Sequence, residues 1–259
     1  MGERWAARQP LLQLPLRACL LSGGESRRMG RDKALLPHPE GGTWLERSLL
    51  LLARLNAPIT LLTRHPAHLE LAQRLALKSG AASGSSTLPP ITALAEPPPW
   101  EGPLLALHRL MQQYPNELLL LCPVDMPDLS LAALHSLLAA AKATKEEAAA
   151  ESPTTLHLAH DGERLQPLLG VYPSSAPIRT HLATAVERGE RRLQSWLVEL
   201  PCQAVTLNPR AIRNVNRPEA DQPADSPSSS TLRSQRSSSA SIRASSSCRG
   251  AGSGNGPCS

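Results

Sequence analysis

The sequence predicts an α/β protein whose mostly parallel sheet has helices on both faces. From about Leu16 to Asn216, short β-like runs alternate with helical patterns of roughly 10 to 15 residues, which is typical of βαβ units. A pair of glycines, Gly23 and Gly24, directly follows the first of these runs. The chain has 259 residues, of which 41% are hydrophobic, so it is long enough to bury a sizeable core.

The individual elements follow from this alternation. We expect strands over 17–22, 58–63 and 117–124, and two more over 154–160 and 167–173. We expect helices over 43–55, 103–114, 130–143 and 176–189. Asp128 and Ser130 are good N-caps for the third helix, and Gly189 closes the fourth.

The composition divides the chain into three parts. Residues 1–15 are predicted to be an N-terminal lead, 16–221 a single domain, and 222–259 a tail rich in Ser, Arg and Gly. The tail has too few apolar side chains to offset the entropy of ordering, which predicts disorder. A phosphorylated or RNA-binding tail is the alternative. Within the domain, 78–90 reads as a low-complexity loop.

Charge and cysteine content exclude several classes of protein. The formal net charge is +5, but four arginines and one aspartate in 222–259 account for +3 of it. Since the chain also has no Phe and only two Tyr and four Trp, a nucleic-acid interface is not predicted. The five cysteines are scattered without CxxC spacing, so neither a zinc site nor a disulfide framework is indicated, and Cys19 and Cys122 are expected in the core. With no membrane span or cleavable leader apparent, we expect a cytoplasmic protein.

The glycine turn is suited to an oxyanion. Glycine tolerates the backbone angles that direct several N–H groups into one space. Arg27, Arg28, Arg31 and Lys33 follow within ten residues, and such side chains bind phosphate. The alternative is an exposed, solvated loop, and the spacing matches neither GxxxxGK[ST] nor GxGxxG.

A second signal follows the strand expected over 117–124. Asp125 comes directly after it, at the edge of an open α/β sheet where ligands bind. A carboxylate there, facing a bound triphosphate, is suited to Mg²⁺, which takes oxygen ligands. The alternative is a turn aspartate before Pro127, and Asp128 is expected to begin the next helix rather than to bind a metal.

The stretch "LSGGESRRMGRDKALL" resembles the signature LxGGxSxRMGxDKxLL of molybdenum cofactor guanylyltransferases. This resemblance implies a Rossmann-like (GT-A-like) fold, in which the glycine loop binds the triphosphate of GTP and the lysine helps to neutralise the leaving pyrophosphate. By position, those roles fall on six residues: Leu21, Ser22, Gly23, Gly24, Arg28 and Lys33.

Shorter matches extend the resemblance to Asp221. The segment "EPPPWEGPLLAL" resembles the family's D…GPLAGI, which places Glu96 where an Asp that contacts guanine is usual and Ala106 where Gly is usual. Gly102 matches the glycine of GPL. The stretches "LQPLLGVYP" and "GERRLQSWL" resemble two further family segments. The closing "NVNRPEAD" resembles NxNTPED, which adds Asn214 and Asn216 to the nucleotide-binding residues.

The resemblance therefore implies transfer of GMP from GTP to molybdenum-molybdopterin, with release of pyrophosphate. Arg28, Lys33 and Asp125 would be catalytic, and Asp125 would bind Mg²⁺ as the cofactor. Molybdenum-insertion proteins and molybdoenzymes are possible partners, a membrane is not, and a monomer is expected. The alternatives are a molybdopterin cytidylyltransferase, a sugar-phosphate nucleotidyltransferase and a non-catalytic GTP-binding protein.

Overall fold

A computed structural model describes residues 14–24, 32–81, 88–147 and 154–215, with the side chains of 78–81 and 144–147 left out. Seven strands form one sheet: β1 Leu16–Leu21, β2 Ile59–Thr63, β3 Ile91–Ala95, β4 Leu118–Pro123, β5 Leu156–His160, β6 Leu165–Pro173 and β7 Cys202–Thr206. The helices are α1 Trp44–Ala53, α2 Pro66–Ala81, α3 Pro103–Gln113, α4 Leu131–Glu147, α5 Ala176–Glu187 and α6 Leu193–Leu197, with a short 3₁₀ turn, η2, at Lys33–Leu35.

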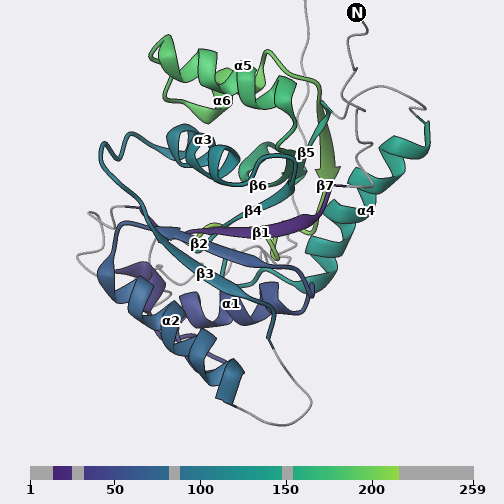
Figure 1. Ribbon diagram of the computed structural model, residues 1–259. Coiled ribbons are helices and arrows are strands. Elements are labelled where there is room, and N and C mark those ends of the chain that lie inside the picture. The colour runs from purple at the N-terminus through teal and green to yellow at the C-terminus, as the bar shows by residue number, and fades with distance from the viewer. Residues whose placement is uncertain (1–13, 25–31, 82–87, 148–153, 216–259) are drawn as a thin grey trace, which may run out of the picture. The chain divides into compact units, whose positions relative to one another are not determined.

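The sheet has the order β3-β2-β1-β4-β6-β5-β7 (Figure 1). Its first four strands are parallel, and β6 runs antiparallel between β4 and β5. Because the chain leaves β1 towards β2 on one side and returns at β4 on the other, the topology reverses between β1 and β4. In open α/β sheets, ligands bind at such a reversal, outside the carboxyl ends of the strands.

Helices cover both faces of the sheet, each over its own apolar core. One core contains side chains of α1, α2 and α4, such as Leu49, Leu71 and Leu134. The other contains side chains of α3, α5 and α6, such as Leu107 and Trp196. Figure 1 shows these two groups of helices on opposite sides of the sheet. The predicted α/β class, with a mostly parallel sheet between helices, is confirmed.

The structure adds elements that the sequence reading left out. The helix α2 and the strands β3 and β7 were not predicted, and Lys78–Ala81 end α2, so the loop prediction for 78–90 was wrong over those residues. At the start of α4, the Ser130 hydroxyl accepts the Ala133 N–H at 3.3 Å and is therefore the cap. Asp128 instead forms an ion pair with Arg213 at 3.4 Å.

The cysteine prediction holds for the two residues in the sheet. Cys19 and Cys122 are buried and have free thiols, and burial raises the pKa of the Cys19 thiol to about 12. In the described part of the chain, no helix combines the length and apolar character needed to cross a membrane. The N-terminal lead is described only from residue 14, and the tail at 222–259 lies outside the described residues, so the domain boundaries stay predictions.

Candidate active site

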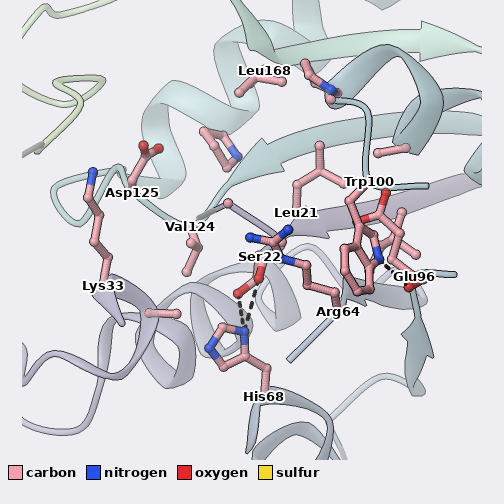
Figure 2. A pocket seen from close by; sticks show the side chains of 18 of the residues that line it. Leu21, Ser22, Lys33, Arg64, His68, Glu96, Trp100, Val124, Asp125 and Leu168 are labelled. Carbon is pink, nitrogen blue, oxygen red and sulfur yellow. Dashed lines mark hydrogen bonds between the residues drawn. The ribbon is translucent and has the colours of Figure 1, made fainter. Parts of the chain in front are cut away.

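A cavity of about 600 Å³ opens at the carboxyl ends of the parallel strands, where the topology reverses between β1 and β4 (Figure 2). One side is formed by the loop after β1, and the opposite side by the loop after β4. Residues after β3 and at the start of α3 close one end. The lining residues include Ser22, Gly23, Gly24, Asp32, Lys33, Arg64, His68, Glu96, Trp100, Gly102, Ala106, Asp125 and Leu168.

Backbone hydrogen bonds of the sheet place the two loops against each other. The Ser22 N–H donates to the carbonyl of Leu62 at 3.1 Å, and the Val124 N–H donates to the carbonyl of Leu21 at 3.1 Å. The parallel ladder therefore extends to the last residues before each loop. As a result, the glycine loop and Asp125, about 100 residues apart in sequence, face the same cavity.

Asp125 contributes a half-buried carboxylate to this site. Its Oδ1 is buried and has no hydrogen-bond partner among the described residues, and burial raises the pKa of the carboxyl group. The positive charge of Lys33 opposes that shift in the pKa of Asp125. The Val215 N–H donates to the Asp125 carbonyl at 3.0 Å, which ties the end of the described chain to this loop. The side chain thus has an acceptor left over inside the cavity.

Lys33 reaches the same end of the cavity from the short turn η2. Asp32 caps this turn, because its Oδ1 accepts the Ala34 N–H at 3.0 Å. Figure 2 shows the Lys33 ammonium and the Asp125 carboxylate directed towards the same region. A mobile point charge beside a half-buried carboxylate is a combination that suits a polyphosphate.

Glu96 lies at the other end of the cavity, just after β3. Its Oε1 accepts a hydrogen bond from Arg109 of α3 at 2.7 Å, so its charge is balanced within the chain. Its Oε2 lies 2.9 Å from the place that a β-carbon on Gly23 would occupy. A side chain at Gly23 would therefore press on Glu96, and glycine allows the loop backbone to approach it.

Two further side chains border this end. Trp100 is 51% exposed, and its indole N–H donates to the Glu96 carbonyl at 2.9 Å. The guanidinium of Arg64, just after β2, lies 5.2 Å from the centre of the Trp100 ring. The result is an exposed aromatic plane that is fixed at its polar edge. Figure 2 shows Trp100, Arg64 and Glu96 grouped together, away from Lys33 and Asp125.

Gly102 begins α3 with a φ of +105°, a backbone conformation that glycine adopts readily and other residues rarely do. Pro103 then occupies the first turn of the helix, where the missing N–H is of no consequence. Ala106 is buried one turn later and still lines the cavity, so the alanine in place of the usual glycine fits the described packing.

The donor set fits a divalent cation that arrives with a polyphosphate. No group of three or more His, Cys, Asp or Glu side chains within the described ranges could bind a metal ion by itself. Asp125 nevertheless offers a buried, unpartnered carboxylate oxygen, which is the type of ligand that Mg²⁺ prefers. Mg²⁺ in nucleotide sites is usually bound by one or two carboxylates together with phosphate oxygens, so Asp125 is sufficient on the protein side.

Comparison with known proteins agrees with this geometry. The model of the MobA-like NTP transferase domain matches residues 18–204. The chain belongs to this family. A probable molybdenum cofactor guanylyltransferase of Rhodopirellula baltica is 37% identical over 210 residues, which cover 79% of this chain and 89% of the relative. A protein of the same name from Synechococcus elongatus is 29% identical over 205 residues, covering 78% of this chain and 93% of the relative.

Solved structures share the fold of this MobA-like chain. Molybdopterin-guanine dinucleotide biosynthesis protein A from Archaeoglobus fulgidus superposes with a TM-score of 0.53 at 17% identity, covering 78% of this chain and 93% of that one. A nucleotidyl transferase from Methanothermobacter thermautotroptrophicus superposes with a TM-score of 0.55 at 18% identity, covering 78% and 92%. The resemblance inferred from the sequence is confirmed.

The structure brings most of the predicted site residues of this MobA-like chain together. The cavity is lined by Leu21, Ser22, Gly23, Gly24, Lys33, Glu96, Gly102 and Asp125. The Asn214 side chain does not line the cavity, and its amide donates a hydrogen bond to the Gln166 side chain at 3.2 Å. Arg28 and Asn216 lie outside the described residues, as do Arg27 and Arg31.

Sequence reasoning missed Arg64, His68 and Trp100, which also line the cavity. Arg64 follows β2 directly, and the rule that ligands bind at the carboxyl ends of parallel strands would have selected it. His68 is four residues further on, in the first turns of α2. Without a prediction of α2, no signal in the sequence pointed to that histidine.

Proposed function

We propose that this protein transfers GMP from GTP to the terminal phosphate of molybdenum-molybdopterin and releases pyrophosphate. The observation that supports this most is the buried Oδ1 of Asp125, which has no hydrogen-bond partner in the described part of the chain and lines the same cavity as the glycine loop. Membership of the MobA-like family and the names of its relatives agree with this activity.

The triphosphate would lie between the loop at Ser22–Gly24 and the loop at Asp125, with its β- and γ-phosphates near Lys33. Mg²⁺, when bound at Asp125, supplies positive charge to the triphosphate oxygens. The base would then reach the end of the cavity at Glu96 and Trp100. Glu96 keeps its Oε2 on the cavity side of its ion pair with Arg109, so this oxygen can accept hydrogen bonds from N–H groups of guanine.

The reaction places few chemical demands on the protein. An oxygen of the molybdopterin phosphate forms a bond to the α-phosphorus, and the bond between that phosphorus and the bridging oxygen breaks. The leaving pyrophosphate carries away the electron pair. A phosphate nucleophile is already ionised at neutral pH, so no general base is required. Catalysis therefore depends on alignment and on neutralising the charge that develops on pyrophosphate, which are the roles proposed for the glycine loop and Lys33.

The direct test is to incubate the purified protein with Mg²⁺, molybdenum-loaded molybdopterin and each of GTP, CTP, ATP and UTP, and to measure pyrophosphate. We expect release with GTP and formation of the guanine dinucleotide. Release with CTP alone would assign a cytidylyltransferase instead. Binding of GTP without pyrophosphate release would assign a nucleotide-binding protein without catalytic activity.

A further inference from the structure

His68 is a nearly inaccessible histidine beside the catalytic cavity, and the mechanism above does not use it. Its side chain is 1% exposed and lies on α2. It is in hydrogen-bonding distance of residues from three other segments: Ser22 after β1, Thr63 at the end of β2, and Asp32 at η2. Figure 2 shows its ring below Ser22, to which dashed lines join it.

The hydrogen-bond geometry assigns a donor role to Nε2. Nε2 faces Oδ2 of Asp32 at 2.7 Å, and a carboxylate oxygen only accepts, so Nε2 carries a proton and donates it. Nδ1 faces the Ser22 hydroxyl at 2.7 Å, the Thr63 hydroxyl at 3.0 Å and the Ser22 carbonyl at 3.1 Å. Both ring nitrogens therefore have partners within the chain, one at Asp32 and the others at the ends of β1 and β2.

The Asp32 carboxylate divides its two oxygens between different tasks. Oδ1 accepts the Ala34 N–H and caps the turn that begins at Lys33. Oδ2 accepts from His68. The imidazole therefore connects the capping residue of the Lys33 turn with the glycine loop. Ser22, Asp32 and His68 all line the cavity, so this connection runs along its wall.

We propose that His68 is a positioning residue for Lys33: it fixes Asp32, and with it the turn that carries the ammonium group, relative to the glycine loop. This inference rests on the proposed function. A lysine that neutralises a leaving group must be placed correctly in the transition state, and a displacement of about 1 Å can lower a rate by about 10²-fold. A three-residue 3₁₀ turn has little internal rigidity of its own, so an external anchor determines where Lys33 lies.

Two substitutions separate the two bonds of the ring. In His68→Asn the amide can take the place of Nδ1 and keep the contact with Ser22, but it is too short to reach Asp32. In His68→Gln the longer amide can take the place of Nε2 and donate to Asp32. We expect His68→Asn to lower kcat about 10-fold with KM for GTP changed less, and His68→Gln to recover most of that loss.

A double-mutant cycle shows whether the effect acts through Lys33. If it does, His68→Asn lowers kcat in the wild-type background but changes it less than about twofold in the Lys33→Ala background. Equal losses in both backgrounds would overturn the proposal, as would full activity of His68→Asn. The Tm of each variant is measured first, so that every assay is run below the temperature at which that variant unfolds. The matched control is His135→Asn, at an exposed histidine of α4.

A readout that needs no activity separates this proposal from the proposed function. Trace labelling with acetic anhydride, followed by mass spectrometry, measures the reactivity of Lys33 relative to the exposed Lys142. We expect this ratio to change in His68→Asn and to return towards the wild-type value in His68→Gln. An unchanged ratio in both variants would show that His68 does not position Lys33, whatever reaction the protein catalyses. An inactive wild type with the predicted labelling would contradict the proposed function alone.

Discussion

The two ends of the cavity each contain a carboxylate whose pKa is raised by burial, yet they differ in how that charge is balanced. Glu96 has its counter-charge within the chain, because Arg109 lies 2.7 Å from it. Asp125 keeps a buried oxygen that no described residue contacts by a hydrogen bond, with the charge of Lys33 in its surroundings. Among the described residues, one end is thus neutralised by an ion pair, whereas the other has only the nearby charge of Lys33.

This difference distinguishes recognition from reaction. The Glu96 end is already neutral, so it can present a fixed hydrogen-bond acceptor and the fixed ring of Trp100 without rearrangement. Such an end is suited to selecting a nucleobase. An end whose carboxylate has only the nearby charge of Lys33, and no hydrogen bond to its buried oxygen among the described residues, gains the most when a cation and a polyphosphate arrive together. Changes at the Asp125 end should therefore alter turnover, and changes at the Glu96 end should alter affinity.

The largest effect is expected for Asp125→Asn. The substitution keeps the size of the side chain and removes the charge, so a metal bound through few protein oxygens would no longer be fixed relative to the α-phosphorus. We expect the rate of pyrophosphate release to fall at least about 10²-fold, with partial recovery at high Mg²⁺ or with Mn²⁺. Asp128→Asn, at an exposed acid three residues later, should leave the rate near the wild-type value. If Asp125→Asn releases pyrophosphate at the wild-type rate in low Mg²⁺, the metal is bound by other residues.

Lys33→Ala tests the positive charge at the same end of the cavity. The ammonium should matter more as charge builds on the leaving pyrophosphate than in the GTP complex, so we expect kcat to fall about 10²-fold with a smaller change in the Kd for GTP. Single-turnover kinetics together with equilibrium binding separate the two quantities. If binding is lost while turnover at saturation is kept, Lys33 contacts only the ground state, and the contrast between the two ends disappears.

Trp100→Ala tests the recognition end. Stacking of a base on an aromatic ring contributes about 1–3 kcal/mol, so the KM for GTP should rise about 10-fold while kcat changes less than about threefold. Trp44 and Trp196 are buried, whereas Trp100 is half exposed, so GTP should quench the fluorescence of the wild type and much less that of Trp100→Ala. A fall in kcat at unchanged KM would show that Trp100 belongs to the reacting end instead.

Some of the predicted site residues lie at the ends of strongly apolar strands, whereas Lys33 was predicted from the cluster of cations after the glycines. Gly23 and Gly24 after β1, and Asp125 after β4, could be predicted as site residues because each strand was recognisable and ligands bind at the carboxyl ends of such strands. Glu96 was placed by resemblance alone, because β3, with the sequence Ile-Thr-Ala-Leu-Ala, is short and only partly buried. Its apolar pattern did not distinguish a strand from a loop.

His68 could not be predicted for a different reason. Its role depends on a helix that the leucine-rich pattern did not reveal and on contacts with Ser22 and Asp32, 46 and 36 residues away. Lone histidines in a helix are usual in the core or on the surface, and only the tertiary structure shows that this one joins two loops of the cavity. Local pattern gives the elements that carry a site, whereas the bonds between those elements depend on the packing.

The smallest expected effect concerns stability, and it has the opposite sign to the effect on activity. The folded-state pKa of Asp125 is raised, so the folded protein binds this proton more tightly than the unfolded chain does, and ionisation of Asp125 destabilises the fold. That cost is largest above the folded-state pKa, decreases as the pH falls below it and is absent below the unfolded-state pKa. Without nucleotide at pH 7, Asp125→Asn should therefore be slightly more stable than the wild type, with a higher Tm.

Calorimetry at a series of pH values would measure this difference, which should narrow towards acidic pH. Adding Mg²⁺ and GTP should reverse the order, because the wild-type carboxylate then gains its counter-charge and ligand binding stabilises the wild type more than the variant. Burial raises the pKa of Glu96 as well, but Glu96→Gln also leaves the partly buried Arg109 guanidinium without its ion-pair partner, and this loss should lower Tm instead. If Asp125→Asn also lowers Tm, the charge of Lys33 already balances Asp125 in the protein without nucleotide.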